Sequence, residues 1–443
     1  MRYIYIAVSF MALLYTVSKK RRPDFFSIYI ASSIVYYMPL FWGKVNDMQY
    51  IKKLVFFPAD ILDETYIFGI INLLTVLIWM VFKDRSGIGC KGYNIVEKAH
   101  HSAAIKAVCC CNLILIIIRI IQLREFLFGK NYNKVLLVQQ LTVWDSLARY
   151  VSLYIMVYGY TVSKDGFIKT MGALFAAYGL YMGRRSDFVI AVIACALYYF
   201  SNHYKVGKSI LYVLTQNKRI TIVLFLFVIV VFPLKKTLPM FREGDWIAAI
   251  QNTIEKMFDI QTYSYSEANT ITCHINKILD KRLYVEMESY LTAVFDVIPF
   301  METLSGGALS GGQFYKVFQT ALYPTIGITV MGLGGTFWGE VIANGGFLLL
   351  LIFLNIHMLF MMSMERIISR ISNTHIALTV MVLCVYLSFY IHRLFLESLL
   401  GIFKFMFLIL IMVIGIDFFL SVFYRKKLRS IFVRKINWTI LRS

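Results

Sequence analysis

The sequence predicts an all-α, multi-pass integral membrane protein with about eleven transmembrane helices. Three observations support this fold class. Hydrophobic residues make up 59% of the 443 positions, charged residues make up only 16%, and the mean hydropathy is +0.68. A soluble globular domain carries more charge, and a disordered chain carries far less apolar side chain. The chain is therefore expected to fold within a lipid bilayer.

Apolar runs of roughly 17 residues or more, close to the length that crosses a bilayer as a helix, occupy most of the chain. They lie at 2–18, 25–42, 66–82, 103–123, 144–162, 166–182, 187–204, 219–234, 341–362, 375–391 and 398–423. These runs predict eleven spans.

Lysine and arginine mark the cytoplasmic loops of membrane proteins, and they set the direction of the spans. Four basic segments follow the first, third, seventh and last spans: Lys19–Arg22, Lys83–Lys98, Lys205–Arg219 and Arg425–Lys435. Eleven spans place all four on one side, so the N-terminus is expected outside and the C-terminus in the cytoplasm. This topology accounts for much of the net charge of +20, and no nucleic-acid partner is needed to explain it.

One connection is much longer than the others, and it divides the chain into three parts. Residues 1–234 would hold eight spans, 235–340 a large outer loop, and 341–443 the last three spans with a basic tail. Helical spacing of apolar residues predicts amphipathic helices from Trp246 to Phe258 and from Leu291 to Ile298. A glycine-rich stretch at 305–314 is open to three interpretations: a mobile lid, a re-entrant turn or a flexible linker.

Arginines gather on the predicted outer face, where the charge rule expects few. They are Arg119, Arg124, Arg149, Arg184, Arg185, Arg242 and Arg393. Arginine beside a membrane usually faces a polar cavity or an anion, and its planar guanidinium matches phosphate oxygens. Each arginine alone could instead extend to the membrane interface. Together they indicate an anionic ligand, most simply a lipid-linked phosphate or diphosphate. Asp187 either caps the next helix or orients Arg184 or Arg185.

A carboxylate stands in the glycine-rich stretch GLGGTFWGEVIANGGF, directly before a long apolar run. Glu340 lies about one turn before Asn344 and the Gly345–Gly346 pair, so it is expected near the mouth of a transmembrane helix. The alternative is a tight turn with a solvated acid at the helix start, favoured by the helix dipole.

These elements together resemble the Wzy-type polysaccharide repeat-unit polymerases, which build bacterial O-antigens and capsules. The resemblance in plan covers the whole chain, with many spans and one large, late outer loop. At residue level it rests on short patches: Gly183–Arg185, Glu340 with Asn344 to Gly346, and Arg393 after the penultimate span.

The resemblance implies an inverting glycosyltransferase related in architecture to the GT-C class, which needs neither a metal ion nor another cofactor. It would act at the periplasmic side of the bacterial inner membrane, with undecaprenyl-diphosphate-linked oligosaccharides as donor and acceptor. A separate chain-length regulator is also implied as a partner. The expected catalytic residues are Glu340 for the acceptor hydroxyl and Arg184, Arg185 and Arg393 for the diphosphate. Further contacts with substrate are expected from Arg149, Arg242, Asp187, Asn344, His392 and His274.

Several alternatives stay open at this stage. His392, His274 or Glu302 could replace Glu340 as the base. The protein could also be an O-antigen ligase, a flippase for lipid-linked oligosaccharides, or a non-catalytic scaffold. The seven cysteines show no CxxC motif and no Cys/His spacing of the kind that binds zinc, so the sequence predicts no metal site.

Overall fold

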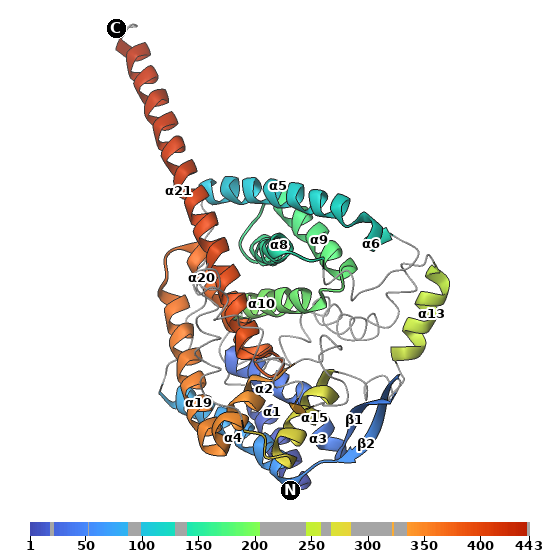
Figure 1. The fold of residues 1–443 in the computed structure, drawn as a ribbon. Helices are drawn as coiled ribbons and strands as arrows, with labels where there is room; N and C mark the ends of the chain where they lie inside the picture. Colours follow the sequence, from blue (N-terminus) through green and yellow to red (C-terminus); the bar gives the residue numbers. More distant parts are fainter. Residues whose placement is uncertain are drawn as a thin grey trace, which may run out of the picture. The chain divides into compact units, whose positions relative to one another are not determined.

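The structure is a computed structural model, and it describes residues 1–17, 22–51, 53–86, 99–128, 140–203, 245–257, 267–284, 321–322 and 335–440. The chain is mostly helical (Figure 1). Within the described ranges, four helices are long and apolar enough to cross a membrane: Asp63–Arg85, His101–Gln122, Phe337–Arg370 and Leu396–Val422. Shorter apolar helices lie at Arg2–Thr16, Phe25–Tyr36 and Thr374–Phe389.

A helix is found at every predicted span that falls in the described part of the chain. In order these are α1 (Arg2–Thr16), α2 (Phe25–Tyr36) with α3 (Pro39–Trp42), α4 (Asp63–Arg85), α5 (Ala99–Gln122), α8 (Val143–Thr161), α9 (Gly166–Tyr181), α10 (Arg185–His203), α19 (Phe337–Arg370), α20 (Thr374–Phe389) and α21 (Leu396–Ile440). The predicted span at 219–234 lies outside the described residues. A short helix, α6 (Arg124–Phe128), follows α5.

In the described part of the chain, the structure departs from an all-α fold between α3 and α4. Strands β1 (Lys44–Ile51) and β2 (Lys53–Asp60) pair antiparallel, with Lys44 opposite Asp60 and Ile51 opposite Lys53. β-branched and aromatic residues such as Val45, Val55 and Phe57 favour this pairing. The apolar runs that identify spans do not cover this segment, which explains why the sequence analysis leaves it without structure.

Two helices of the predicted outer segment fall within the described residues. Helix α13 (Trp246–Met257) confirms the first predicted amphipathic helix, and the Asp245 carboxylate accepts a hydrogen bond from the Ala248 N–H at 3.1 Å. Helix α15 (Glu267–Asp280) was not predicted. The predicted helix at 291–298 and the glycine-rich stretch at 305–314 lie outside the described part of the chain.

The chain divides into two compact units, and each is described by itself. Unit 1 comprises Met1–Tyr93, Ala196–Arg370 and Met381–Lys404, and unit 2 comprises Asn94–Cys195, Ile371–Val380 and Phe405–Ser443. Unit 1 packs α1, α2, α4, α15 and the start of α19 around large buried side chains that include Tyr5, Phe26, Tyr29, Phe68 and Trp338. Unit 2 packs α5, α8 and α9 together.

Helix α15 is amphipathic, and side chains along most of its length are buried in unit 1. The Asn269 amide binds the backbone of β1: it accepts a hydrogen bond from the Asn46 N–H at 2.7 Å and donates one to the Asn46 carbonyl at 2.8 Å. The Asn276 carbonyl oxygen accepts hydrogen bonds from the Leu62 N–H at 2.9 Å and the Thr65 hydroxyl at 2.8 Å. Polar contacts of this kind cannot be read from apolar periodicity alone.

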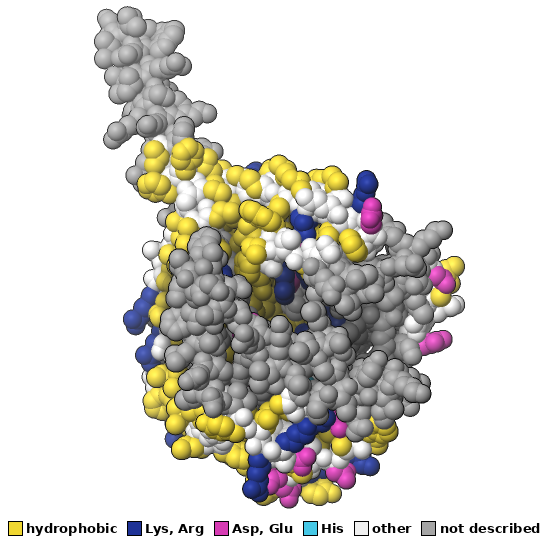
Figure 2. Space-filling model, viewed as in Figure 1, with side chains coloured by type: hydrophobic (Ala, Val, Ile, Leu, Met, Phe, Trp, Pro, Cys, Tyr) yellow, Lys and Arg dark blue, Asp and Glu magenta, His cyan; other side chains and the backbone are white. Residues whose placement is uncertain are grey.

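Apolar side chains remain exposed along the long helices of each unit. On α5 they are Ile114, Ile117, Ile118 and Ile121, and on α19 they include Leu348, Ile352, Ile356 and Leu359. Figure 2 shows hydrophobic side chains along the visible side of α5. A soluble protein seldom exposes contiguous apolar stripes of this length, whereas lipid-facing helices do. The chain is therefore treated as a membrane-embedded protein.

Candidate functional site

The Glu340 segment forms the short first part of α19 in unit 1. Helix α19 is broken at Gly345 and Gly346, where the backbone leaves the helical region. Gly346 has φ 63° and ψ −156°, a conformation that residues with a Cβ rarely adopt. Phe337 to Asn344 therefore form a separate helical segment, and every side chain in it is buried.

The Glu340 carboxylate holds the turn that carries Arg393. Its Oε2 accepts a hydrogen bond from the Leu396 N–H at 2.9 Å, and the Gly335 N–H donates to the Arg393 carbonyl at 3.1 Å. A Cβ on Gly335 would lie 2.2 Å from the Phe395 ring, so only glycine permits this close approach. Glu340 is fully buried, and its Oε1 has no hydrogen-bond partner among the described residues.

Arg393 is a paired, partly exposed cation beside this segment. Its Nη1 lies 2.9 Å from the Glu267 carboxylate, and its guanidinium sits over the Tyr390 ring at 5.6 Å from the centroid. Its side chain is 28% exposed. Burial opposes the charged form, but Glu267 and the Tyr36 hydroxyl outweigh it and raise the pKa of Arg393 above its ordinary value. Arg393 therefore stays charged and faces solvent in part.

The three other predicted residues of unit 1 are buried. The His392 ring lies between two hydroxyls of the α2 region, with Nε2 3.1 Å from Ser33 Oγ and Nδ1 3.0 Å from Tyr37 Oη. Burial lowers its pKa, so the ring is neutral. His274 lies inside α15, where burial and then the charge of Lys277 lower its pKa to about 3. The Asn344 amide donates to the Glu340 carbonyl at 2.8 Å and so caps the segment.

Unit 2 gathers a second set of predicted residues at the start of α8 and α10. The Arg149 guanidinium makes a two-pronged contact with Asp187, with Nε and Nη2 each 2.6 Å from a carboxylate oxygen. It also lies over the Tyr150 ring, 4.9 Å from the centroid. Such forked pairs fix the orientation of both side chains. Asp187 therefore orients Arg149, a partner that the sequence alone did not indicate.

Arg184 has a different environment from its neighbour. Its Nη1 donates to the Asp145 backbone carbonyl at 3.1 Å, and in the described part of the chain no carboxylate lies within ion-pair distance of it. Burial, and then repulsion from Arg149, lower its pKa. A narrow pocket adjoins both arginines and is also lined by Asp187, Tyr178 and Ser152. Arg184 thus presents a cation without a carboxylate partner at a pocket. Arg185 follows as the first residue of α10.

Arg119, by contrast, is committed to holding α5 against α8. Its Nε and Nη2 lie 3.1 and 2.6 Å from the two oxygens of Asp145, and it also bonds Gln122 and the Gln140 carbonyl. Asp145 in turn accepts the Thr142 N–H at 2.8 Å at the start of α8. Arg119 is thus saturated by structural contacts, whereas Arg149 and Arg184 border a pocket.

The predicted site residues fall into two sets, one in each unit. Unit 1 brings Glu340 and Asn344 together with the turn of His392 and Arg393, and it holds His274 in α15. Unit 2 brings together Arg149, Arg184, Arg185 and Asp187. Arg242 lies outside the described residues.

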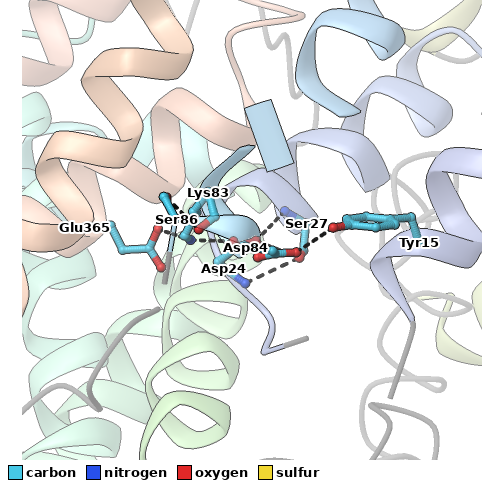
Figure 3. Close-up of polar contacts among 7 residues, drawn as sticks. All are labelled: Tyr15, Asp24, Ser27, Lys83, Asp84, Ser86 and Glu365. Atoms are coloured by element: carbon cyan, nitrogen blue, oxygen red, sulfur yellow. Dashed lines mark hydrogen bonds and ion pairs between the residues drawn. The ribbon is translucent and has the colours of Figure 1, made fainter. Parts of the chain in front are cut away.

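Two polar clusters are not predicted from the sequence. The sequence predicts a loop at Lys83, yet this residue lies inside α4 with its Nζ 2.6 Å from Asp24, and it also pairs with Glu365 (Figure 3). In unit 2, His101, His375 and Asp417 converge. The members of each cluster lie far apart in the chain, so no spacing in the sequence could reveal them.

Comparison of the chain with protein-family models, with curated proteins and with solved structures finds no match.

Proposed function

We propose that the chain is a repeat-unit polymerase for a bacterial surface polysaccharide, an O-antigen or a capsule. It would span the cytoplasmic membrane eleven times, with its N-terminus outside, and join oligosaccharides carried on undecaprenyl diphosphate at the outer face. The resemblance in plan to Wzy-type polymerases suggests this reaction. The observation that carries the proposal is the turn of Arg393, docked onto the buried Glu340 segment.

Polar contacts between helix ends support the alternating direction of the proposed spans. In unit 1, the Tyr15 hydroxyl at the end of α1 donates to Asp84 at the end of α4 at 2.9 Å. At the other ends of the same helices, the Met1 amino group lies 3.8 Å from Asp63. In unit 2, Lys106 near the start of α5 pairs with Asp165 before α9 at 2.5 Å. Each contact joins two residues that the topology assigns to the same side.

The proposed reaction transfers the growing glycan from its lipid diphosphate to an acceptor sugar. The acceptor hydroxyl oxygen attacks the anomeric carbon of the donor, and the bond from that carbon to the diphosphate oxygen breaks. The leaving diphosphate takes the electron pair, and its developing charge is stabilised by preplaced arginines. The proton of the acceptor hydroxyl passes to a carboxylate, which we assign to Glu340.

The contacts of Glu340 support two parts of this role. Its Oε2 fixes the backbone of the Arg393 turn, and its Oε1 is the oxygen left to accept a proton or hydrogen bond. Arg393 and Glu340 would then act as one unit, the first on the diphosphate and the second on the acceptor. Because His392 and His274 are neutral and enclosed, we assign them to the support of this unit.

The pocket of unit 2 supplies a further place for phosphate. Arg184 faces it without a carboxylate partner, while Arg149 is oriented by Asp187 at its edge. A phosphate oxygen there would relieve the repulsion between the two guanidinium groups. We therefore propose that Arg184 and Arg149, together with Arg185, bind a diphosphate of donor or acceptor.

The experiment that tests the function is a size profile of surface glycan after deletion and restoration of the gene. Glycan limited to a single repeat, with the ladder returning on complementation, is the expected result. Loss of surface glycan with long lipid-linked chains accumulating would instead identify a ligase. Single units trapped on the cytoplasmic face would identify a flippase.

Variants of the site then test the mechanism in the complemented strain. Arg393→Ala and Arg185→Ala are expected to abolish long chains at normal protein level, and Glu340→Gln to do the same. The exposed Arg124, on α6, offers a matched control, since Arg124→Ala should leave the ladder unchanged. Ladders of normal length in both arginine variants would refute the phosphate role, and a normal ladder in Glu340→Gln would refute the proton transfer.

A further inference from the structure

Two imidazoles and one carboxylate converge inside unit 2, and none of the three has a role in the proposed reaction. His101 lies near the start of α5, His375 near the start of α20, and Asp417 within α21. Each offers one ligand atom, and these three atoms lie within 4.8 Å of one another. We propose that this cluster binds a divalent transition-metal ion, with Zn²⁺ as the best match.

The spacing of the ligand atoms is close to that of a zinc site. His101 Nε2 and Asp417 Oδ2 are 3.5 Å apart. Ligands bonded to a tetrahedral Zn²⁺ at about 2.0–2.1 Å lie roughly 3.3–3.4 Å from each other. The other separations among the three ligand atoms are at most 4.8 Å, so a shift of about 1.5 Å or less would bring them to this spacing. The two imidazole centroids are already 4.6 Å apart.

A neighbouring tyrosine sets the His375 ring in the orientation that metal ligation requires. The Tyr154 hydroxyl lies 2.8 Å from His375 Nδ1. If Nδ1–H donates to that hydroxyl, Nε2 keeps its lone pair for a metal ion. Metal-bound histidines almost always make such a hydrogen bond through the other ring nitrogen. The ring also stacks on Tyr158, with centroids 6.0 Å apart and planes 23° apart.

The donor set selects the class of ion. Two imidazoles and one carboxylate suit Zn²⁺ and its transition-metal neighbours, whereas Mg²⁺ and Ca²⁺ prefer oxygen ligands alone. Both histidines are buried and the Asp417 side chain is 14% exposed, so a water molecule can complete the coordination. The alternative for the same residues is a metal-free histidine–carboxylate hydrogen bond.

The metal would serve structure and take no part in the proposed glycosyl transfer. His101 and Arg119 lie on the same helix, 18 residues apart, which is ~27 Å along the axis. The cluster also shares no residue with the lining of the arginine pocket. An ion held by α5, α20 and α21 would tie α5 to two helices that lie far from it in the sequence. This inference stands whether or not the chain is a polymerase.

The test uses the full chain, purified in detergent with an affinity tag that contains no histidine, and stripped of metal with a chelator. Titration with Co²⁺ alone is expected to produce visible d–d absorption that saturates at one equivalent, and Zn²⁺ should displace it. Zinc absorption-edge spectroscopy should then report bonds of about 2.0–2.1 Å to nitrogen and oxygen.

Three variants locate the site, and a fourth serves as the control. His375→Gln and Asp417→Asn should each weaken Zn²⁺ binding by at least about 10–100-fold, and Tyr154→Phe by a smaller factor. His357→Gln removes a buried histidine of unit 1 and should bind Zn²⁺ as the wild type does.

Thermal unfolding before metal addition shows which variants are folded. Tyr154→Phe keeps all three metal ligands, so it can still test the site if the ligand variants fail to accumulate. Zn²⁺ should raise the unfolding temperature of the wild type more than that of Tyr154→Phe at equal concentration. A folded wild type that binds no stoichiometric Zn²⁺, or equal Zn²⁺ affinity in wild type and every folded variant, would overturn the proposal.

Discussion

Lys83 of unit 1 is buried and Arg184 of unit 2 is partly buried, and the two cations differ in their partners. Lys83 is 4% exposed and contacts the carboxylates of Asp24 and Glu365, on the start of α2 and the end of α19. Arg184 contacts a backbone carbonyl and borders a pocket. A cation enclosed by carboxylates holds helices together, whereas under the proposed function a cation without one would receive an anion from outside.

The largest expected effect comes from breaking the Lys83 cluster. Lys83→Met removes a buried cation that two carboxylates contact, and losing one partner of such a cluster costs roughly 3–5 kcal/mol. We expect the variant to accumulate poorly in membranes and to unfold at a lower temperature. Immunoblotting of membranes and thermal unfolding in detergent would measure this. Wild-type accumulation and unfolding would show that Lys83 is not a structural cation.

The second largest effect is expected from substitution of Arg184, which should reduce polymerase activity without unfolding the protein. Arg184→Ala should abolish long glycan chains, because the pocket loses its unpaired cation, while the protein stays at normal level in the membrane. Arg184→Lys should restore only part of the chain length, because an ammonium group cannot make a forked contact with phosphate. Gel profiles of glycan, normalised to protein level, provide the measurement. If Arg184→Ala destabilised the protein as Lys83→Met does, the contrast between the two cations would fail.

A smaller effect is expected from neutralising Asp187, the carboxylate that lines the pocket. Asp187→Asn weakens the fork on Arg149, whose side chain is 29% exposed, so the loss of stability should not exceed about 1–2 kcal/mol. Removing a negative charge should also tighten binding of inorganic diphosphate severalfold. The unfolding temperature, measured as a function of diphosphate concentration, would report both the loss of stability and the change in diphosphate affinity. Weaker diphosphate binding in this variant would show that Asp187 organises the pocket more than it opposes the anion.

The smallest expected effect concerns the exposed hydrogen bond between Tyr15 and Asp84, and whether it contributes to the stability of the protein. Tyr15→Phe removes one hydrogen bond to Asp84, in an exposed pair that lies close to the Lys83 cluster in Figure 3. A single exposed hydrogen bond is worth about 0.5–1 kcal/mol at most. Thermal unfolding should therefore change little beside Lys83→Met. A comparable loss in both variants would mean that the helix ends, and not the buried cation, hold this region.

The sequence predicted the helices well and the polar interior poorly. Long apolar runs locate helices directly, as with α4 and α21, and the pattern from Trp246 to Phe258 located α13. The Gly345–Gly346 break was also foreseeable, because glycine marks backbone that other residues cannot adopt. Helix α15 was missed because Asn269, His274 and Asn276 look solvated in sequence but are buried through contacts with distant residues. The partners of Lys83 and of His375 depend on packing between helices, which no local pattern encodes.

The break at Gly346 also changes the length of chain available to cross the bilayer. From Phe347 to Arg370, α19 runs for about 24 residues, or ~36 Å at 1.5 Å per residue. The hydrocarbon layer is about 30 Å thick, so this part alone is long enough to traverse it. The segment from Phe337 to Asn344 is surplus to that crossing and can rest at the level of the lipid headgroups. In the proposed reaction, a carboxylate held there would meet a lipid-borne sugar at the depth where its diphosphate is anchored, and neither partner would have to leave the interface.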